Sequence, residues 1–350
     1  MAEFCGHIIE DYIRDENLFK TRNIEILVAV LIVGIALSGI LASRYVLYLF
    51  ISIGISIIAT LGLNIITGLT GMISLGHGAF VGVGAYSTAI LTDRLGLPFL
   101  LSVPLSAFIT SCVGMFFGLP SLRIKGLYLL MSTLAAQVII NFLMINWRSL
   151  TKGVNGYPLS PAAIFGFVLD SETKYFYLVL VVTLLCILSA SNVARSRYGR
   201  AFIAIRDQDI AADAIGVNLF KYKTLSFAIG SFYAGLAGAL LAHYLRIATP
   251  EHFPLNLSIE YLAMIIVGGL GSILGCIYGA IFMTLLPEFL KIVMEENLVR
   301  LIPGAIGAVP HINNILFGLI IVIFLIFEPH GFAEIHRRIK KYFKLWPFAY

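Results

Sequence analysis

The chain has 350 residues, of which 59% are hydrophobic and only 12% are charged, and its mean hydropathy is +0.94. A soluble domain of this length carries about twice that share of charged residues, so the composition excludes a soluble globular protein. The basic residues behind the net charge of +5 are concentrated in segment 192–223 and in the tail from His336 onward. This indicates that both segments are cytosolic, and that the tail contacts lipid rather than nucleic acid.

Repeated apolar runs of about 18–25 residues indicate transmembrane helices. We expect an all-α, polytopic integral membrane protein of about 8–10 transmembrane or half-spanning helices. Its membrane domain is 24–335, between a polar N-terminal segment, 1–23, and a basic cytosolic tail, 336–350. Segment 1–23 lacks the basic start of a secretory signal, so the first span is expected to stay in the mature chain. The expected spans are 24–42, 45–67, 73–91, 98–119, 127–146, 175–191, 224–245, 258–270, 272–290 and 313–328.

The end of the second expected span and the start of the third carry a dense group of small and polar residues: Gly68, Gly71, Ser74, Gly76, His77 and Gly78. Irregular backbone cannot face lipid, so this group predicts an unwound or tightly crossed segment that lines a translocation pathway. His77 is the only titratable residue expected deep in a span. A hydrogen bond to a neighbouring helix explains it as well as ion coupling does.

A second glycine-rich break, with Gly268, Gly269 and Gly271, follows the eighth expected span. The two breaks resemble a weak internal repeat, and duplicated halves with interrupted helices recur in transporters. We therefore expect this break to line the pathway as well. Gly275 and Gly279, further along, are better explained by close packing between helices.

Segments between the spans differ in character. Segment 147–174 contains turn-forming residues and is expected outside the cell, whereas Arg123 and Lys125 fit a cytoplasmic turn. A short interfacial helix is expected in 291–312, which contains Pro303 and Pro310. Positive charge resists translocation, so segment 192–223 is predicted to be cytosolic.

Within 192–223, the run from Asp209 to Gly216 predicts a short helix that ends at a glycine cap. Its alanine-rich surface would allow a partner protein to approach closely, while nearby arginines could pair with acidic groups. A solvated amphipathic helix with no partner is the alternative. The residues that we expect to act in this coupling loop are Arg200, Arg206, Asp207, Asp209, Ala211, Ala212 and Gly216.

The chain contains no G-x-x-x-x-G-K-[ST] phosphate loop, so we expect it not to hydrolyse nucleotides itself. Its four cysteines have no metal-like spacing, and we expect no metal site, no cofactor and no catalytic residues. Carriers driven by protons or sodium usually keep Asp, Glu or His within their spans, and here such residues are few. Glu260 is expected at a span end.

Several motifs together resemble the permease subunits of branched-chain amino acid ABC transporters, the LivM-like family. They are L-T-G-M-I-S-L-G-H-G from Leu69, T-K-G-V-N-G from Thr151, R-A-F-I-A-I-R-D-Q-D-I-A-A-D-A-I-G from Arg200 and S-I-E-Y-L-A-M-I-I-V-G-G-L-G-S from Ser258. The resemblance implies two cytosolic ABC ATPase subunits, a sister permease in a heterodimer and an extracytoplasmic solute-binding protein. Ile210 stands where the general importer motif has a glutamate, which puts an ion pair from that position in doubt.

The resemblance implies a subunit that imports branched-chain or other apolar amino acids across the plasma membrane, in bacteria the inner membrane, with ATP hydrolysed by its partners. Related permeases also resemble importers of urea or another small amide, which remains an alternative. An ion-coupled secondary carrier and a membrane scaffold are two further alternatives. The carrier needs a buried titratable site, and the scaffold leaves the paired glycine breaks unexplained.

Overall fold

The computed structural model of the protein describes residues 33–39, 42–119, 126–164, 167–301, 309–328 and 331–345. Segment 1–23 and the basic residues Arg123 and Lys125 lie outside the described residues. Within the described part, the fold is overwhelmingly helical, as expected of apolar segments whose backbone groups must bond within each segment in lipid. Six helical stretches in the described ranges are long and apolar enough to cross a membrane: Arg44–Leu69, Phe99–Gly118, Tyr128–Asn146, Glu172–Arg195, Leu219–Leu245 and Ile273–Ile292.

Residues 33–39 are helical, and the elements that follow in the first half are α3 (Arg44–Leu63), the π-helix η1 (Asn64–Leu69), α4 (His77–Asp93), α5 (Phe99–Gly118) and α6 (Leu127–Asn146). The connection to the second half contains α7 (Arg148–Thr151), η3 (Gly153–Asn155), β1 (Tyr157–Pro158), β2 (Ala163–Ile164) and β3 (Phe167–Val168). The second half comprises α8 (Glu172–Arg195), α9 (Arg197–Asp207), α10 (Asp209–Ala214), α11 (Leu219–Leu245), β4 (Ile247–Ala248), η4 (Pro250–His252), α12 (Leu255–Gly268), α13 (Ile273–Leu301), α14 (Val309–Phe327) and α15 (Gly331–Leu345).

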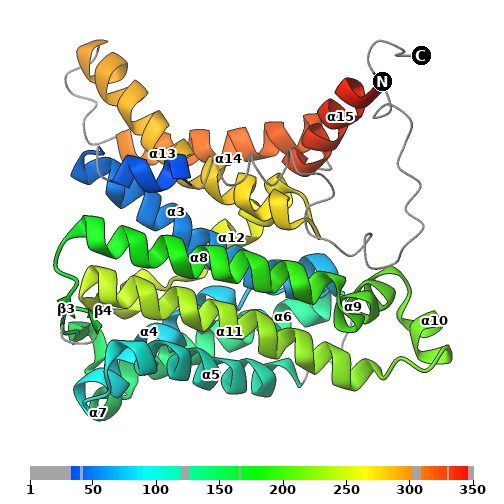
Figure 1. Cartoon of the computed structure of the whole chain (residues 1–350), viewed down its shortest axis with the longest axis horizontal. Helices are drawn as coiled ribbons and strands as arrows, with labels where there is room; N and C mark the ends of the chain where they lie inside the picture. Colours follow the sequence, from blue (N-terminus) through cyan, green and yellow to red (C-terminus); the bar gives the residue numbers. More distant parts are fainter. Residues whose placement is uncertain are drawn as a thin grey trace.

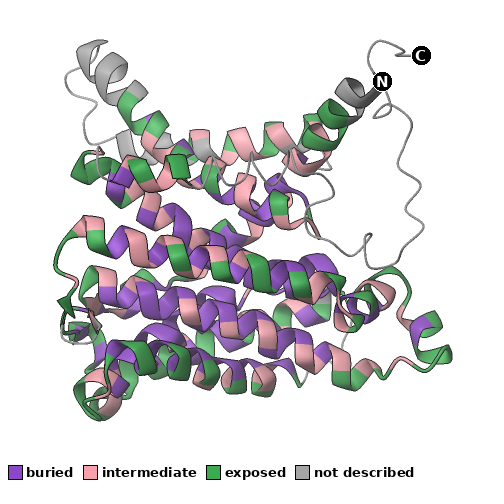
Figure 2. Cartoon of the chain, in the orientation of Figure 1, coloured by how far each residue is buried: buried purple, intermediate pink, exposed green. Residues whose placement is uncertain are grey.

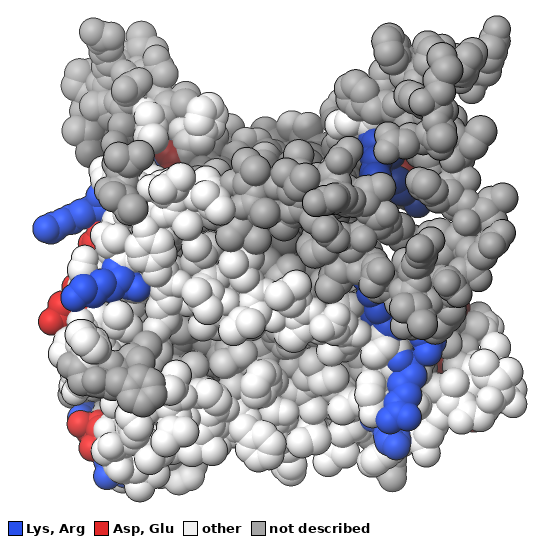
Figure 3. All heavy atoms as spheres, viewed as in Figure 1, with Lys and Arg blue, Asp and Glu red and all other residues white. Residues whose placement is uncertain are grey.

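The helical segments therefore match the expected all-α membrane protein. Most long helices run along the long axis of the molecule, with α7, β3 and β4 at one end and α9, α10 and α15 at the other (Figure 1). Charged side chains gather near these two ends and leave a mostly uncharged band between them on the face seen in Figure 3. This banding is typical of a protein that spans a bilayer. We call the end with α7 the outer end and the end with α9 the inner end.

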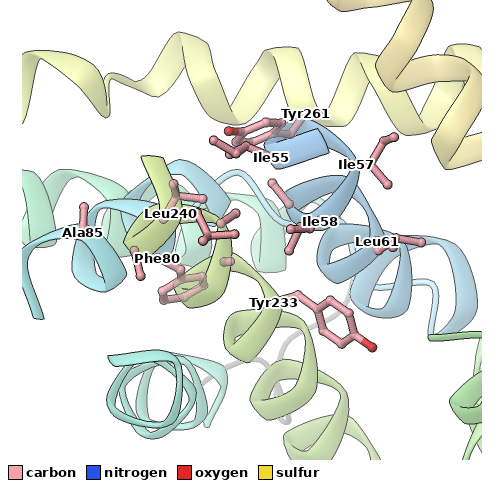
Figure 4. Packing of buried hydrophobic residues seen from close by; sticks show 14 of the residues in the cluster. Ile55, Ile57, Ile58, Leu61, Phe80, Ala85, Tyr233, Leu240 and Tyr261 are labelled. Atoms are coloured by element: carbon pink, nitrogen blue, oxygen red, sulfur yellow. The ribbon is translucent and has the colours of Figure 1, made fainter. Parts of the chain in front are cut away.

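Helix α11 lies at the centre of the bundle and packs against α3, α4 and α5. Its residues are mostly buried (Figure 2), and Leu240 and Tyr233 meet Ile58 of α3 and Phe80 of α4 in the core (Figure 4). A Cβ built on Gly62 would touch the backbone oxygen of Gly230, so glycine permits α3 and α11 to approach closely.

The packing interpretation of the glycines after the second break is supported by the contacts of α12 with α13. Gly268 lies directly against the backbone of Gly275, and a Cβ on Gly268 would be 3.3 Å from Gly279 Cα. A Cβ on Gly279 would collide with the carbonyl of Met264. These glycines let the two helices touch backbone to backbone.

Several connections differ from the expectation. Segment 192–223 contains more helix than the one short helix expected there, because α8 continues to Arg195, α9 and α10 fill its middle and α11 begins at Leu219. The expected outer loop 147–174 contains β1, which pairs in antiparallel fashion with β4 through Tyr157 and Ala248. The prediction of a separate short helix in 291–312 was wrong for the first part of that segment, since α13 continues to Leu301. Residues 302–308 lie outside the described part.

Candidate functional site

Helix α9 is fixed to the inner end of the bundle by a capped start and a buried face. The Ser196 hydroxyl accepts hydrogen bonds from the backbone N–H groups of Tyr198 and Gly199. Such a cap satisfies amides at the helix start that have no partner within the helix. Phe202 is fully buried and its ring packs edge-on against Tyr222 of α11. Helix α9 is therefore a rigid part of the membrane domain, not a free loop.

The exposed side of α9 carries a cation beside an aromatic ring. Arg197 donates a hydrogen bond of 3.0 Å from Nη2 to the Tyr198 hydroxyl. This guanidinium lowers the pKa of Tyr198 below its usual value. Both groups lie on the surface of the inner end.

Helix α10 confirms the short helix that the sequence predicts, including its glycine cap. Gly216 has a φ of +90°, and its N–H donates to Asp213 at 2.9 Å while the N–H of Val217 donates to Ala212 at 2.9 Å. This pair of bonds is the Schellman arrangement, in which a left-handed residue closes the helix end. The run from Asp209 to Gly216 thus forms one compact turn that projects from the inner end (Figure 1).

The exposed surface of α10 and its C-cap is mostly apolar, with Asp213 as its charged residue. Ile210 is 70% exposed and Ile215 is 77% exposed, and Ala211 between them is also exposed. Ala212, by contrast, is only 2% exposed and faces the membrane domain. Large apolar side chains are seldom grouped at such exposure on a surface that stays in water, so this projection has the character of a contact surface.

The charged residues of the expected coupling loop have internal partners. Asp209 lies 3.8 Å from Nζ of Lys223, a buried residue of α11. Arg200 donates from Nη1 to the Arg195 carbonyl at 3.2 Å and so caps the end of α8. Asp207 pairs with Arg206 at 3.0 Å. Of these contacts, the one between Asp209 and Lys223 joins α10 to α11, whereas the pair of Arg206 with Asp207 is local to α9.

Arg206 has a second contact that the sequence did not reveal. Its Nη1 donates a 3.0 Å hydrogen bond to the carbonyl oxygen of Gly68, in the first glycine break. A Cβ built on Gly71 would lie 2.9 Å from Arg206 Cγ, and one on Gly271 would lie 3.0 Å from Arg206 Nη1. Arg206 is therefore the point at which α9 meets both breaks.

The two glycine breaks touch each other. The N–H of Gly271 donates to Oδ1 of Asn64 at 2.8 Å, and a Cβ on Gly68 would lie 2.5 Å from Gly271 N. Gly71, Gly269 and Gly271 all have positive φ values, which glycine adopts without strain. The contact of Asn64 with Gly271 joins α3–η1 to the connection between α12 and α13. The sequence showed two similar breaks but gave no sign that they meet.

Beyond Gly71, the first break is closed by side chains from α6 and α12. The N–H of Leu75 donates to Thr133 Oγ1 at 3.0 Å. The N–H groups of Gly78 and Ala79 donate to Ser258 Oγ at 2.7 Å and to Gln137 Oε1 at 2.8 Å. The start of α4 is thus capped within the membrane domain by side chains distant in sequence.

His77 is fully buried in this closed arrangement. Its Nε2–H donates to the Ala59 carbonyl at 2.8 Å, whereas Nδ1 has no partner among the described residues. Ser74 is also fully buried, and Gly68, Gly76 and Gly78 are buried with it. Among the first-break residues expected on the pathway, only Gly71 is exposed. Their role in translocation stays a prediction.

A second histidine is buried in the described part of the chain, near the outer end of α11. His243 of α11 is 3% exposed, and its Nε2 lies 3.2 Å from the hydroxyl of Thr88. The ring packs edge-on against Phe99 at a centroid distance of 4.8 Å.

The described residues contain no group of three or more His, Cys, Asp and Glu side chains that could hold a metal ion. The sites expected from the sequence correspond in the structure to a projecting helix, α10, and two glycine breaks that touch each other. Arg206 of α9 contacts both breaks.

Comparison with known proteins identifies similar sequences over most of the chain. Residues 45–325 match the family model described as the branched-chain amino acid transport system permease component. The chain is 30% identical to the high-affinity branched-chain amino acid transport system permease protein LivM of Salmonella typhimurium, covering 81% of this chain and 68% of that protein. It is 24% identical to the probable LivM of Methanocaldococcus jannaschii, over 79% of this chain and 90% of that one.

A relative with a different named cargo is also similar. The autoinducer 2 import system permease protein LsrC of Enterobacter is 27% identical, over 77% of this chain and 79% of that protein. No solved structure matches the chain.

Proposed function

The chain belongs to the branched-chain amino acid transport system permease family. From this premise we propose that it is the membrane subunit of an ATP-driven importer and that its helix α10 is the contact surface for the ATPase subunit. The family and the apolar spans together make it a multi-pass membrane transport protein. It works with ABC ATPase subunits and a sister permease, as permeases of such transport systems do. Its cargo is a branched-chain or other apolar amino acid, delivered by an extracytoplasmic solute-binding protein.

The observation that carries the ATPase contact is the exposure pattern of α10. Ile210, Ala211 and Ile215 are exposed on a helix that is fixed to the bundle through Asp209 and through α9. An apolar projection of small and branched residues fits a groove on a partner protein, and burying it there would remove exposed apolar area from water. Because α9 contacts the first break through Arg206, a push on α10 would reach the glycine breaks.

Cysteine cross-linking tests the contact, and the chain offers a matched control. Ala211→Cys places a thiol on the exposed side of α10, and it should cross-link to a cysteine in the ATPase groove. Ala212→Cys places a thiol one residue away on the buried side and should not cross-link. If both positions remain unlinked in the assembled complex, or if Ala211→Cys reacts only with reagents added from outside, the proposal fails.

The cargo is tested by competition. LsrC, named for autoinducer 2 import, shows that similar permeases occur in systems with other cargo. Uptake of labelled leucine by the complete complex should be displaced by isoleucine and valine but not by urea. Displacement by urea alone would assign the small-amide alternative.

A further inference from the structure

The chain from Glu251 to Glu260 carries a series of exposed polar residues that none of the interactions described so far explains. Glu251, His252, Asn256 and Glu260 are all exposed, whereas Phe253, Ser258 and Tyr261 on the opposite side are buried. In α12 the exposed residues are confined to this first part, at Asn256, Ile259 and Glu260. A single polar side therefore begins before α12 and ends at Glu260.

This polar side descends from the outer end into the membrane domain. Its start is fixed by Ala248, which pairs with Tyr157, whose hydroxyl donates to Asp93 at the end of α4. Phe253 is already inside, since a Cβ on Gly82 would lie 3.0 Å from its ring. At 1.5 Å per residue, Gly82 is about 16 Å along α4 from Asp93. Segment 249–254 thus enters the bundle before any helix begins.

Glu260 lies deeper still. Ser258 accepts from Gly78 N at 2.7 Å, and Gly78 is about 22 Å along α4 from Asp93. Towards the inner end, Glu260 is about 12 Å along α12 from Gly268. Gln137, near the middle of α6, contacts the same Ser258 at 3.1 Å. The carboxylate is thus well inside a hydrocarbon layer of about 30 Å, not at a span end as the sequence suggested.

No group among the described residues of this chain donates a hydrogen bond to the Glu260 carboxylate, and no cation pairs with it. An exposed carboxylate at this depth cannot face lipid, because ionised side chains inside a membrane are found against protein partners or in water-filled cavities. The polar side of 251–260 must therefore face an aqueous pathway or the sister permease. The pathway is favoured because exposed polar residues recur from the outer end to Glu260, at positions 251, 252, 256 and 260, with only Pro254 and Ile259 as apolar exposed residues between them.

We propose that segment 251–260 lines the outer half of the translocation pathway and that the Glu260 carboxylate at its inner end binds the ammonium group of the amino acid cargo. The proposal rests on the function proposed above, since it requires a cargo with an ammonium group. A carboxylate is the natural partner of an ammonium, and the bond between two charged groups is stronger than a neutral one. Below Glu260, α12 leads directly to Gly268 and the second break.

The test uses the complete complex reconstituted in liposomes with its solute-binding protein, and the variant Glu260→Gln. This substitution keeps size and removes charge, so leucine uptake should fall by at least about tenfold. Glu260→Asp keeps the charge and should retain most of the uptake. Asp170→Asn also removes one negative charge, but from an exposed pair with Arg246 at 3.1 Å outside the proposed pathway; it is the matched control and should stay within about twofold of the wild type.

Two results would overturn the inference. Uptake by Glu260→Gln close to the wild-type rate would show that the carboxylate does not hold the cargo. Loss of the sister permease from the purified Glu260→Gln complex would show that Glu260 pairs with a cation of that subunit instead. Failure of the proposed function is distinguishable, because then the wild-type complex itself would accumulate no amino acid.

Discussion

Replacing Arg206 by alanine should uncouple ATP hydrolysis from transport. The substitution removes the 3.0 Å hydrogen bond to the Gly68 carbonyl and the side-chain contacts with Gly71 and Gly271. Helix α9 would remain in place, because it is held by buried Phe202 and by the cap at Ser196. The connection between the ATPase contact surface and the glycine breaks would be lost, while the contact surface itself would stay intact.

The size of the effect follows from the bond. A hydrogen bond from a charged donor contributes about 1.5–3 kcal/mol, and the Arg206 side chain is 38% exposed, so water screens it. We therefore take the lower limit, about 1.5 kcal/mol, which corresponds to about a tenfold change in an equilibrium. The amount of leucine transported for each ATP hydrolysed should fall by about that factor.

The assay is simultaneous measurement of uptake and ATP hydrolysis in proteoliposomes, with Asp207→Asn as control. Asp207 pairs with Arg206 at 3.0 Å, but its side chain is 62% exposed, and such surface pairs contribute about 0–1 kcal/mol. The control keeps the bond to Gly68 and should stay within about twofold of wild type. An unchanged transport ratio in Arg206→Ala would refute the reasoning, as would an equal fall in both variants.

Substitutions at Gly216, Gly78 and His77 test α10 and the first glycine break. Gly216→Pro removes the 2.9 Å hydrogen bond from Gly216 N to Asp213, and proline cannot adopt a φ of +90°, so transport should be uncoupled from ATP hydrolysis while the protein still inserts into the membrane. Gly216→Ala has open space around its Cβ and should cost only about 1–2 kcal/mol of local stability. A transport assay and a membrane-insertion assay compare the two variants. Gly78→Leu should abolish uptake, because its Cβ would lie 2.8 Å from Ser258 Oγ. His77→Gln should reduce uptake only slightly, since an amide can still donate to the Ala59 carbonyl. Loss of pH-dependent uptake in His77→Gln, together with uptake that does not need ATP, would favour an ion-coupled carrier.

The helices and their order could be predicted because apolar length and glycine or proline interruptions are local properties of the sequence. The same holds for α10, since its three alanines and the glycine that ends it lie within one short run of the sequence. Segment ends were less accurate: α13 continues through the boundary expected at 290 to Leu301, with Pro287 inside the helix. Pairing of β1 with β4 joins residues far apart in the chain and left no local signal.

The site was predicted in its parts but not in its connections. Glycine spacing indicated two breaks, yet the bond from Gly271 to Asn64 depends on how α3 and α12 pack. Arg206 was assigned to the partner surface because basic residues cluster around it, whereas the structure turns it inward to Gly68. Glu260 was placed at a span end because hydropathy cannot show that segment 249–254 enters the membrane domain without forming a long helix.

The central claim is that this chain transports solute only with energy from ATP hydrolysed on other subunits. The most direct measurement is uptake of labelled leucine into liposomes, with this chain alone and with its ATPases, sister permease and loaded binding protein. The account predicts no accumulation by the chain alone under any ion gradient, and accumulation by the complete complex only when ATP is present. Accumulation by the chain alone, abolished by a protonophore or by removal of sodium, would contradict it.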